Sequence, residues 1–235
     1  MVIPIVVAAA LMQAPAFRFE PIPKTAAELA QRFTPEQIAV LEALNRRDRA
    51  HLTRTDPDWP GLVVPVMWSD DLLTYSPFPP EWPSMATVVK AIAVSQPLQA
   101  FAAYEHGRLV RWGPVSTGRK PSQTPAGTFN LTWRSRKRRS TENQAWLLEW
   151  YFNFVNERGV SFHLFELPGY PASHACVRLL QRDAQWLYDW GDPWTLDQNR
   201  TLKSPGTPVV ILGTYPFGQP APWLALAPPP VTLPR

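Results

Sequence analysis

Short runs of hydrophobic and β-branched residues fill the middle of the chain, and they predict β-strands. These runs are rich in Val, Phe, Tyr, Trp and Thr, and turn residues such as His106-Gly107 and Arg158-Gly159 separate them. They span residues 87–94, 98–104, 109–115, 127–133, 146–154, 160–164 and 207–212. Short strands at this spacing predict a mainly β protein, built as a β-sandwich or barrel.

Two helical patterns precede the strands, and a third follows most of them. Thr34-Pro35-Glu36-Gln37 has the form of an N-cap, a proline at the first helical position and the glutamine of a capping box. The helix that begins there is expected to be amphipathic, with one group of residues on a shared face (Ile38, Leu41, Leu44, Asn45) and another elsewhere (Glu36, Glu42, Arg46, Arg47). Residues 25–33 predict a weaker helix before it, and residues 183–190 predict one short helix late in the chain.

Prolines divide the chain into segments. Residues 55–84 carry seven prolines and three tryptophans, which suggests a wrapped linker and not a second core. The tail from Pro216 has seven prolines and is expected to be extended and dispensable to the core. We therefore expect an N-terminal helical and proline-rich segment at residues 17–84, a β-rich domain at 85–213 and a proline-rich tail at 214–235.

The composition describes a folded, basic protein. Its 235 residues are 45% hydrophobic and include eleven tryptophans, so they can fill a sizeable core. The net charge of +4 favours a polyanion, whether nucleic acid, anionic lipid or acidic wall polymer. The basic run Arg134, Arg136, Lys137, Arg138 and Arg139 is expected in a loop, either as a solvated hairpin or as a contact for anionic wall polymer or an acidic peptide. A nucleic-acid interface would have aromatic residues between the charges as stacking platforms, but only Trp133 is close to this basic run. No nucleic-acid partner is therefore predicted.

The first residues resemble a short signal peptide. Residues 1–12 are almost entirely apolar, and Ala14-Pro15-Ala16 supplies the small side chains that a signal peptidase reads. We expect residues 1–16 to be removed on export, so that the mature chain begins near Phe17. The run lacks Lys and Arg, and a buried first strand stays open as the alternative. No later stretch approaches the 18 apolar residues of a membrane span.

The single cysteine lies in a suggestive setting, Ser173-His174-Ala175-Cys176-Val177-Arg178. One thiol cannot form an internal disulfide or a Cys-based metal site, but a neighbouring imidazole can activate it as a nucleophile. His163 ends a predicted strand thirteen positions earlier, and a returning strand would bring it alongside. The alternative is an inert, buried cysteine. His51 and His106 have no cysteine or second histidine near them in the sequence, and they are interpreted as surface residues.

These residues resemble the L,D-transpeptidase catalytic domain family of the YkuD type. The family signature is His-Gly, a loop, then Ser/Thr-His-Gly-Cys, an apolar residue and Arg, which His163 and residues 173–178 match. Further similarity lies in Ser116-Thr117-Gly118, Thr124-Pro125-Ala126-Gly127-Thr128-Phe129, Asp183-Ala184 and residues 206–211, in the expected order. Leu164 and Ala175 replace the two glycines, and Ala175 costs about 1 kcal/mol or more if its backbone is left-handed.

The resemblance implies a role for each site residue. Cys176 would attack a peptidoglycan stem peptide after a diaminopimelyl centre and form a thioester, with His163 as general base oriented by a backbone carbonyl. His174 would orient the loop or contact substrate, although an extended segment would place it on the same face as Cys176. Backbone N–H groups around Ala175 and Cys176, beside Ser173, would bind the oxyanion.

Arg178 would either bind a substrate carboxylate or clamp the structure, and its charge could lower the pKa of the thiol. The resemblance implies no metal and no cofactor, and it implies a protein of the periplasm or cell wall.

Three other functions stay open. An L,D-carboxypeptidase would use water in place of the second peptide. A wall-binding module with a degenerate site would explain Leu164, Ala175 and the basic run. A papain-like peptidase also uses Cys and His, but its nucleophile precedes its histidine in the sequence, whereas here His163 precedes Cys176.

Overall fold

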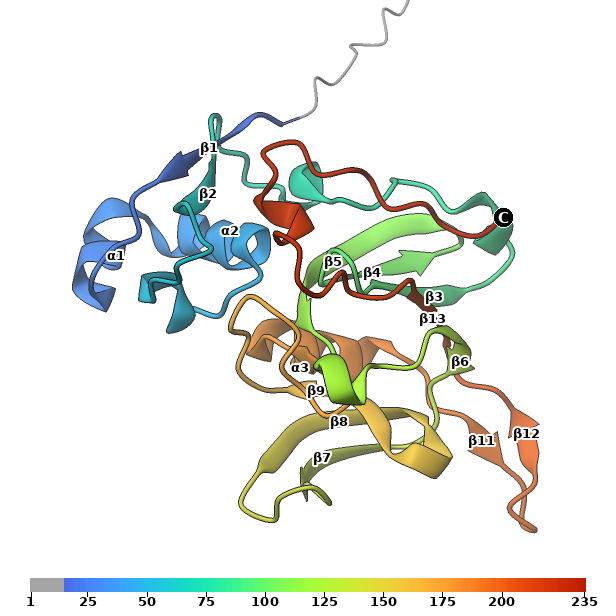
Figure 1. Cartoon of the computed structure of the whole chain (residues 1–235). Coiled ribbons are helices and arrows are strands. Elements are labelled where there is room, and N and C mark those ends of the chain that lie inside the picture. The colour runs from blue at the N-terminus through green and yellow to red at the C-terminus, as the bar shows by residue number, and fades with distance from the viewer. Residues whose placement is uncertain (1–14) are drawn as a thin grey trace, which may run out of the picture.

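The computed structural model describes residues 15–235, and its main element is a curled sheet of nine strands (Figure 1). Residues 1–14, which make up most of the predicted signal peptide, lie outside the described residues. The strands follow the order β6 (Gly127–Asn130), β13 (Pro208–Leu212), β3 (Lys90–Ser95), β4 (Ala100–Glu105), β5 (Arg108–Ser116), β10 (Val177–Leu179), β9 (Val160–Leu164), β8 (Leu147–Val155) and β7 (Arg134–Arg139). Only the pairs β13–β3 and β10–β9 within it are parallel.

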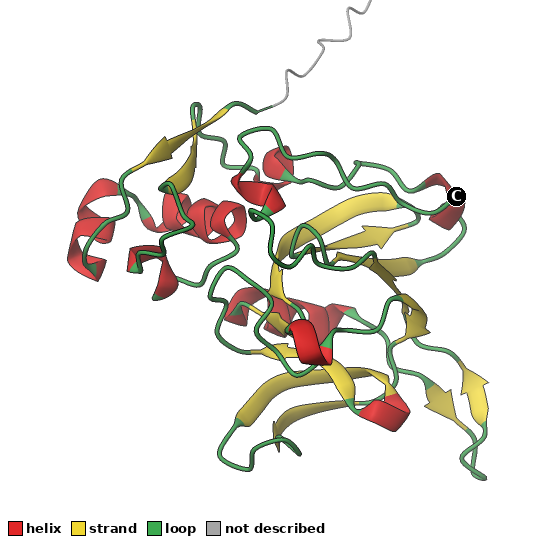
Figure 2. Cartoon of the chain, in the orientation of Figure 1, coloured by secondary structure: helices red, strands yellow, loops and turns green. Residues whose placement is uncertain are grey.

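The remaining elements flank this sheet. Two small sheets pair β1 (Phe17–Glu20) with β2 (Leu62–Pro65) and β11 (Thr195–Leu196) with β12 (Leu202–Ser204). The α-helices are α1 (Ala26–Arg32), α2 (Pro35–Asn45) and α3 (Gln181–Trp190). Short 3₁₀ helices lie at His51–Thr53, Leu72–Tyr75, Pro83–Met85, Lys120–Ser122, Asn156–Arg158 and Pro222–Leu224. In Figure 2, which has the orientation of Figure 1, the helices α1 and α2 lie together at one side of the large sheet. A mainly β fold with a short helix after the cysteine motif and a helical N-terminal segment is therefore confirmed.

The central strands bury both of their faces. Along β3, Ala91 and Ala93 point into one hydrophobic cluster, while Ile92 and Val94 point into another. Because side chains alternate along a strand, this arrangement requires apolar residues at consecutive positions. The second cluster lies inside the curl of the sheet, where α3 packs against β8 and β9. It is the core beneath the cysteine.

The first cluster joins both ends of the described chain to the outer face of the sheet. Tyr75 and Trp82 enter it from residues 55–84, and Trp223 and Leu224 enter it from the tail. Trp223 is only 2% exposed, so the prediction that the tail is dispensable to the core is wrong. Proline-rich segments have little regular structure, but their aromatic side chains can still pack.

The N-terminal segment, residues 17–84, begins as the sequence predicts and then departs from it. Thr34 and Gln37 form the predicted capping box at the start of α2. Residues 55–84 do contribute to a separate core, because Leu62 and Val64 join α1 and α2 in a third hydrophobic cluster.

The helix α2 is not amphipathic as expected, because one side of it packs in the first cluster and another in the third. Val40, Ala43 and Leu44 lie in the first cluster, whereas Ile38 and Leu41 lie in the third. Three of the polar residues expected away from the apolar face, Glu42, Arg46 and Arg47, are buried as well. Their charged groups meet backbone carbonyls, aromatic rings or Arg182 in place of water.

The basic run is a strand and not a loop. Arg134–Arg139 forms β7, the edge strand beside β8, with Arg134 opposite Phe152 and Arg139 opposite Leu147. A run of arginines has low β-propensity, so the pairing with β8 decides its structure. Charged residues are common on exposed edge strands, since they discourage pairing with another chain.

Candidate active site

Cys176 lies directly before β10, and the neighbouring strand β9 brings His163 into the same pocket. In the parallel pair, Val177 lies opposite Phe162 and Arg178 lies opposite His163. Alternation then directs Cys176, Arg178 and His163 to one side of the sheet. All three line a cavity of about 90 Å³. The structure therefore brings together the two residues on which the predicted chemistry depends.

The thiol of Cys176 is partly exposed and has polar neighbours. Its Sγ lies 3.4 Å from Oγ of Ser161 and 3.9 Å from the carbonyl oxygen of Gly159. Burial raises the pKa of Cys176, while hydrogen bonds from the Ser161 hydroxyl and backbone N–H oppose that rise, as do the charges of Arg178 and Arg138. The group is thus a protonated thiol at neutral pH. The sequence reasoning missed Ser161, although alternation along 160–164 places it on the same face as His163.

His163 is a neutral imidazole with its lone pair available. Its side chain is only 4% exposed, and its Nδ1 lies 2.9 Å from the carbonyl oxygen of Leu164. Because a carbonyl oxygen only accepts, Nδ1 carries the proton and Nε2 is left as the basic atom. Burial lowers the pKa of His163 to about 4; the Leu164 hydrogen bond opposes this and the charge of Arg178 adds to it. The backbone carbonyl that the resemblance implies beside His163 is therefore present, and it belongs to Leu164.

His174 uses its lone pair elsewhere. Its Nε2 lies 2.6 Å from Nη2 of Arg119, and a guanidinium can only donate, so Nε2 accepts this hydrogen bond. The ring packs against Trp146 at a centroid distance of 5.4 Å. Among residues 15–235, Nδ1 of His174 has no hydrogen-bond partner although it is buried. His174 therefore carries its proton on Nδ1, which is closed to solvent. Arg119 was not identified from the sequence.

Ala175 adopts the left-handed backbone conformation that the family's glycine would allow, with φ of 85°. The chain from His174 to Cys176 is therefore not extended, and alternation does not place the two side chains on one face. Hydroxyl groups hold this turn: Thr124 donates to the carbonyl of Ala175 at 2.8 Å, and Ser173 donates to that of Cys176. Buried Ser173 thus supports the turn through its hydroxyl.

Arg178 holds the loop between the two motif halves. Its Nη2 donates to the carbonyl of Ala172 at 2.9 Å and its Nη1 to that of Glu166 at 3.4 Å. The guanidinium carbon lies 4.5 Å from the ring centroid of Phe165. Burial lowers the pKa of Arg178. These contacts are those of a structural clamp, and the Arg178 side chain also lines the pocket that contains Cys176.

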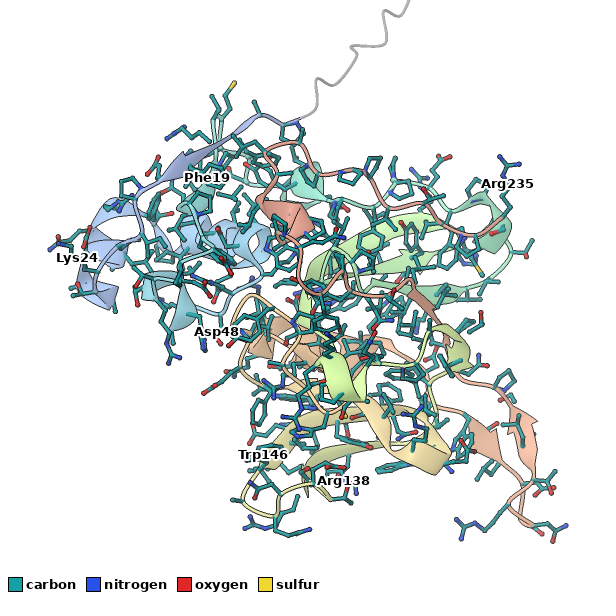
Figure 3. The ribbon with its side chains drawn as sticks, in the orientation of Figure 1. Phe19, Lys24, Asp48, Arg138, Trp146 and Arg235 are labelled. Atoms are coloured by element: carbon teal, nitrogen blue, oxygen red, sulfur yellow. The ribbon has the colours of Figure 1, made fainter. Side chains whose placement is uncertain are left out.

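The hairpin between β7 and β8 forms the outer wall of the pocket. The part of the wall that comes from this hairpin is made of Arg138, Ser140, Thr141, Glu142, Trp146, Leu148 and Tyr151. Figure 3 shows Arg138 and Trp146 together at this hairpin. Trp146 also contacts the ring of Phe165, at a centroid distance of 5.9 Å, so the wall closes over the strand end that carries His163.

The arginines of β7 stack on aromatic rings that the sequence order does not reveal. Arg136 lies 3.3 Å above the ring of Trp150, and Arg138 lies 4.7 Å above that of Tyr151. These rings are covered by guanidinium groups, so they are not free platforms for nucleic-acid bases. Lys137 pairs with Glu149 at 2.7 Å, whereas the exposed Arg136 has no carboxylate within salt-bridge distance among residues 15–235.

The other two histidines lie apart from the pocket. His106 is exposed, as expected. The prediction that His51 is a surface residue is wrong, because it is 6% exposed and its Nδ1 lies 2.8 Å from Asp48. Within residues 15–235, no group of three His, Cys, Asp or Glu side chains is placed to hold a metal ion. No helix in the same residues is long and apolar enough to cross a membrane.

Comparison with known proteins identifies the family. The model of the L,D-transpeptidase catalytic domain (YkuD) matches residues 89–211, which is more than half of the chain. The chain therefore belongs to the L,D-transpeptidase family. No curated protein sequence matches it.

Solved structures of L,D-transpeptidases are also similar to this chain. The enzyme from Stackebrandtia nassauensis shares 24% identity at a TM-score of 0.44, over 54% of this chain and 57% of that one. One from Mycobacterium smegmatis shares 18% identity at a TM-score of 0.42, over 53% and 59%. One from Mycobacterium tuberculosis H37Rv shares 20% identity at a TM-score of 0.42, over 53% and 58%. The chain thus spans less than two thirds of the length of each.

Proposed function

We propose that this protein is a peptidoglycan L,D-transpeptidase that acts through a thioester on Cys176. The observation that carries the proposal is the state of His163: a buried, neutral imidazole whose Nδ1–H is held by Leu164 and whose Nε2 is basic, in the pocket that also contains the thiol. A thiol whose pKa is raised by burial needs such a base.

The first half-reaction forms the thioester. His163 takes the thiol proton on Nε2 while Sγ of Cys176 bonds to the carbonyl carbon that follows the diaminopimelyl centre of the stem peptide. The tetrahedral intermediate carries a negative oxygen, for which we propose the backbone N–H groups at Ala175 and Cys176 as donors. A left-handed residue such as Ala175 lets successive N–H groups converge on an anion. The C–N bond then breaks, and His163 returns the proton to the departing amine of the terminal D-amino acid.

The second half-reaction transfers the acyl group. The amine of another stem peptide attacks the thioester carbonyl, its proton passes to His163, and the C–S bond breaks as that proton returns to sulfur. The new amide is a cross-link. Water in place of the amine gives the L,D-carboxypeptidase product through the same proton transfers.

His174 and Arg178 take supporting roles in this proposal. His174 orients the loop beside Cys176, and the hydrogen bond from Arg119 keeps its Nε2 from acting as a base. Arg178 clamps the loop before the motif and adds positive charge beside the stem-peptide carboxylates.

Incubation with purified muropeptides, followed by mass spectrometry, tests the function. A transpeptidase joins two stem peptides and releases one D-amino acid, whereas a carboxypeptidase only releases the D-amino acid. A wall-binding module leaves the masses unchanged, and that result would overturn the proposal. The Cys176→Ala variant is the control, because it should retain the pocket and produce neither product.

We also propose that β7 contacts anionic wall polymer. Arg136 and Arg139 are exposed on this edge strand. Substitution of both by Gln should weaken binding to an anionic wall polymer and reduce its salt dependence, since fewer counterions are displaced. Arg200→Gln, at an exposed arginine outside β7, is the matched control. Equal binding by all three proteins would contradict the proposal.

We also propose export, with residues 1–16 as the signal peptide, because residues 1–12 are almost entirely apolar and Ala14 and Ala16 have the small side chains that a signal peptidase reads. Mass spectrometry of the protein from its host envelope should find a chain that begins near Phe17. An intact Met1 on protein from the cytosol would contradict export to the periplasm or cell wall.

A further inference from the structure

The loop that joins the two halves of the motif is held by the N-terminal segment. We name this loop, residues 165–172, the strap; it follows His163 and Leu164 and ends directly before Ser173. The matched family domain spans residues 89–211, so the segment that holds the strap lies outside that domain. Figure 3 shows Asp48 at the part of the segment that lies next to the strap.

Asp48 binds the middle of the strap from two sides. Its Oδ2 accepts the backbone N–H of Leu167 at 2.8 Å, and its own N–H donates to the Leu167 carbonyl at 2.9 Å. Its Oδ1 accepts from the backbone N–H of His51 at 3.0 Å and lies 2.8 Å from Nδ1 of the same residue. These partners of the carboxylate are N–H groups. Burial tends to raise the pKa of Asp48, but the hydrogen bonds from His51 and Leu167 and the charge of His51 together lower it.

Arg47 binds the next part of the strap. Its Nε donates to the carbonyl of Pro168 at 3.2 Å, and its guanidinium carbon lies 3.4 Å from the ring centroid of Trp59. Gly169 packs against this stacked pair: a Cβ at that position would lie 2.7 Å from Cζ2 of Trp59 and 2.9 Å from Nε of Arg47. The strap therefore packs closely against the N-terminal segment at three consecutive residues, Leu167, Pro168 and Gly169.

The strap in turn covers the base. The ring of Phe165 meets the imidazole of His163 edge-on, at a centroid distance of 5.9 Å, and lies beneath the guanidinium of Arg178. Burial is the main cause of the low pKa of His163. Leu167, which Asp48 binds, is two residues beyond Phe165, so the anchor of the strap is close to the ring that shields the base.

We infer that Asp48 and Arg47 are positioning residues: they fix the strap so that Phe165 keeps His163 buried and oriented as a base. This inference rests on the proposed role of His163 in the reaction. It gives the N-terminal segment a part in the chemistry, although no residue of that segment lines the pocket around Cys176.

Titration of His163 by NMR in the Asp48→Asn variant tests the inference. The amide keeps the shape of the side chain but opposes an N–H donor with its own NH₂. We expect the pKa of His163 to rise from about 4 toward its ordinary value of 6.5, because the loosened strap admits water. Direct electrostatics would act in the opposite direction, since removal of a negative charge lowers the pKa of an imidazole.

The other groups that act on His163 are unchanged in this variant. The charged or titratable side chains that line its pocket are Cys176, Arg178, His174, Arg138, Glu142, Tyr151 and Arg158, and none belongs to the N-terminal segment. Glu20→Gln is the matched control, because Glu20 is also a carboxylate of the N-terminal segment with a lowered pKa, but its partners Arg18 and Arg32 do not touch the strap. It should leave the His163 titration at the parent value.

Gly169→Ala provides an independent perturbation, because it displaces the strap and leaves Asp48 intact. We expect it to raise the pKa of His163 as well, and both variants to slow acylation of Cys176 by at least 10-fold at neutral pH, since a misplacement of about 1 Å can cost 10²-fold. An unchanged titration in the folded variants would overturn the inference. Because the titration does not require turnover, it can fail while the proposed transpeptidase activity stands, and it can succeed if that activity is absent.

Discussion

The burial of His163 makes the stability of the protein depend on pH in a defined window. Its pKa is about 4 in the folded protein and 6.5 for an ordinary imidazole, so the unfolded chain binds more protons between these values. The free energy of unfolding therefore rises with pH across this window. The stability associated with the neutral imidazole is fully present above about pH 6.5 and is lost as the pH falls toward 4.

The magnitude follows from the difference between the two pKa values. Each pKa unit corresponds to about 1.4 kcal/mol, so the full effect of His163 is on the order of 3 kcal/mol at pH 4 and about 2 kcal/mol at pH 5. Small domains are typically stable by about 5–15 kcal/mol, so this loss would be readily measurable. The buried carboxyls of Glu42 and Asp183 have raised pKa values and act in the opposite sense, because they favour the folded state as the pH falls.

Urea unfolding of the parent and of His163→Gln at several pH values separates these contributions. Glutamine does not titrate, but its amide can still donate to the Leu164 carbonyl. The difference in unfolding free energy between the two proteins should change by about 2–3 kcal/mol between pH 7 and pH 4.5, in favour of the variant at the lower pH. Glu42 and Asp183 are present in both proteins, so their effects cancel. A constant difference across this range would refute the burial argument and, with it, the neutral base.

The following outcomes are expected for other variants. Cys176→Ala should abolish turnover and leave the melting temperature within a few degrees of the parent, as activity and circular dichroism would show. His174→Gln should leave the pH profile of Cys176 alkylation near the parent, whereas His163→Gln should move it to higher pH; the reverse order would make His174 the base. Ala175→Gly should change the unfolding free energy by less than about 1 kcal/mol, because relief of the left-handed backbone (about 1–2 kcal/mol) is offset by a lost methyl contact and a more flexible unfolded chain. Ala175→Val should destabilise clearly, and equal stability of both variants would contradict the strained backbone. Gly118→Ala should also destabilise, since its Cβ would lie 2.1 Å from the carbonyl oxygen of Ser122, and an unchanged melting temperature would contradict this packing.

The sequence predicted the parts of the site that depend on local spacing. The strand that ends at His163 and the motif around Cys176 are short-range patterns, and their parallel pairing places the two side chains in one pocket. The alternation of side chains along β9 could also have predicted that Ser161 lies on the same face as His163. The partner of His174 could not be predicted from local spacing. Arg119 lies 55 positions away in the sequence, and only the tertiary structure brings the two side chains together.

Two errors in the sequence reasoning share a physical cause. The run Arg134–Arg139 has no hydrophobic pattern, yet β8 pairs with it and aromatic rings receive its guanidinium groups. Glu42 and Arg47 were predicted to lie away from the apolar face of an amphipathic helix, but both are buried, because α2 packs in two hydrophobic clusters. In both cases a charged side chain finds its partner outside its own helix or strand, and single-sequence periodicity contains no information about that partner.

The packing of residues 216–235 has a consequence for how the chain reaches its native state. The carbonyl of Pro234 accepts hydrogen bonds from Nε1 of Trp82 at 2.9 Å and from the hydroxyl of Ser84 at 3.0 Å, about 150 positions earlier. Such contacts close very long loops, and topologies rich in them fold slowly. A chain whose synthesis has stopped short of residue 223 lacks Trp223 and would leave part of the first hydrophobic cluster open. Until these residues are made, the growing chain therefore exposes apolar surface of the first cluster, and this part of the core can be completed only late in synthesis.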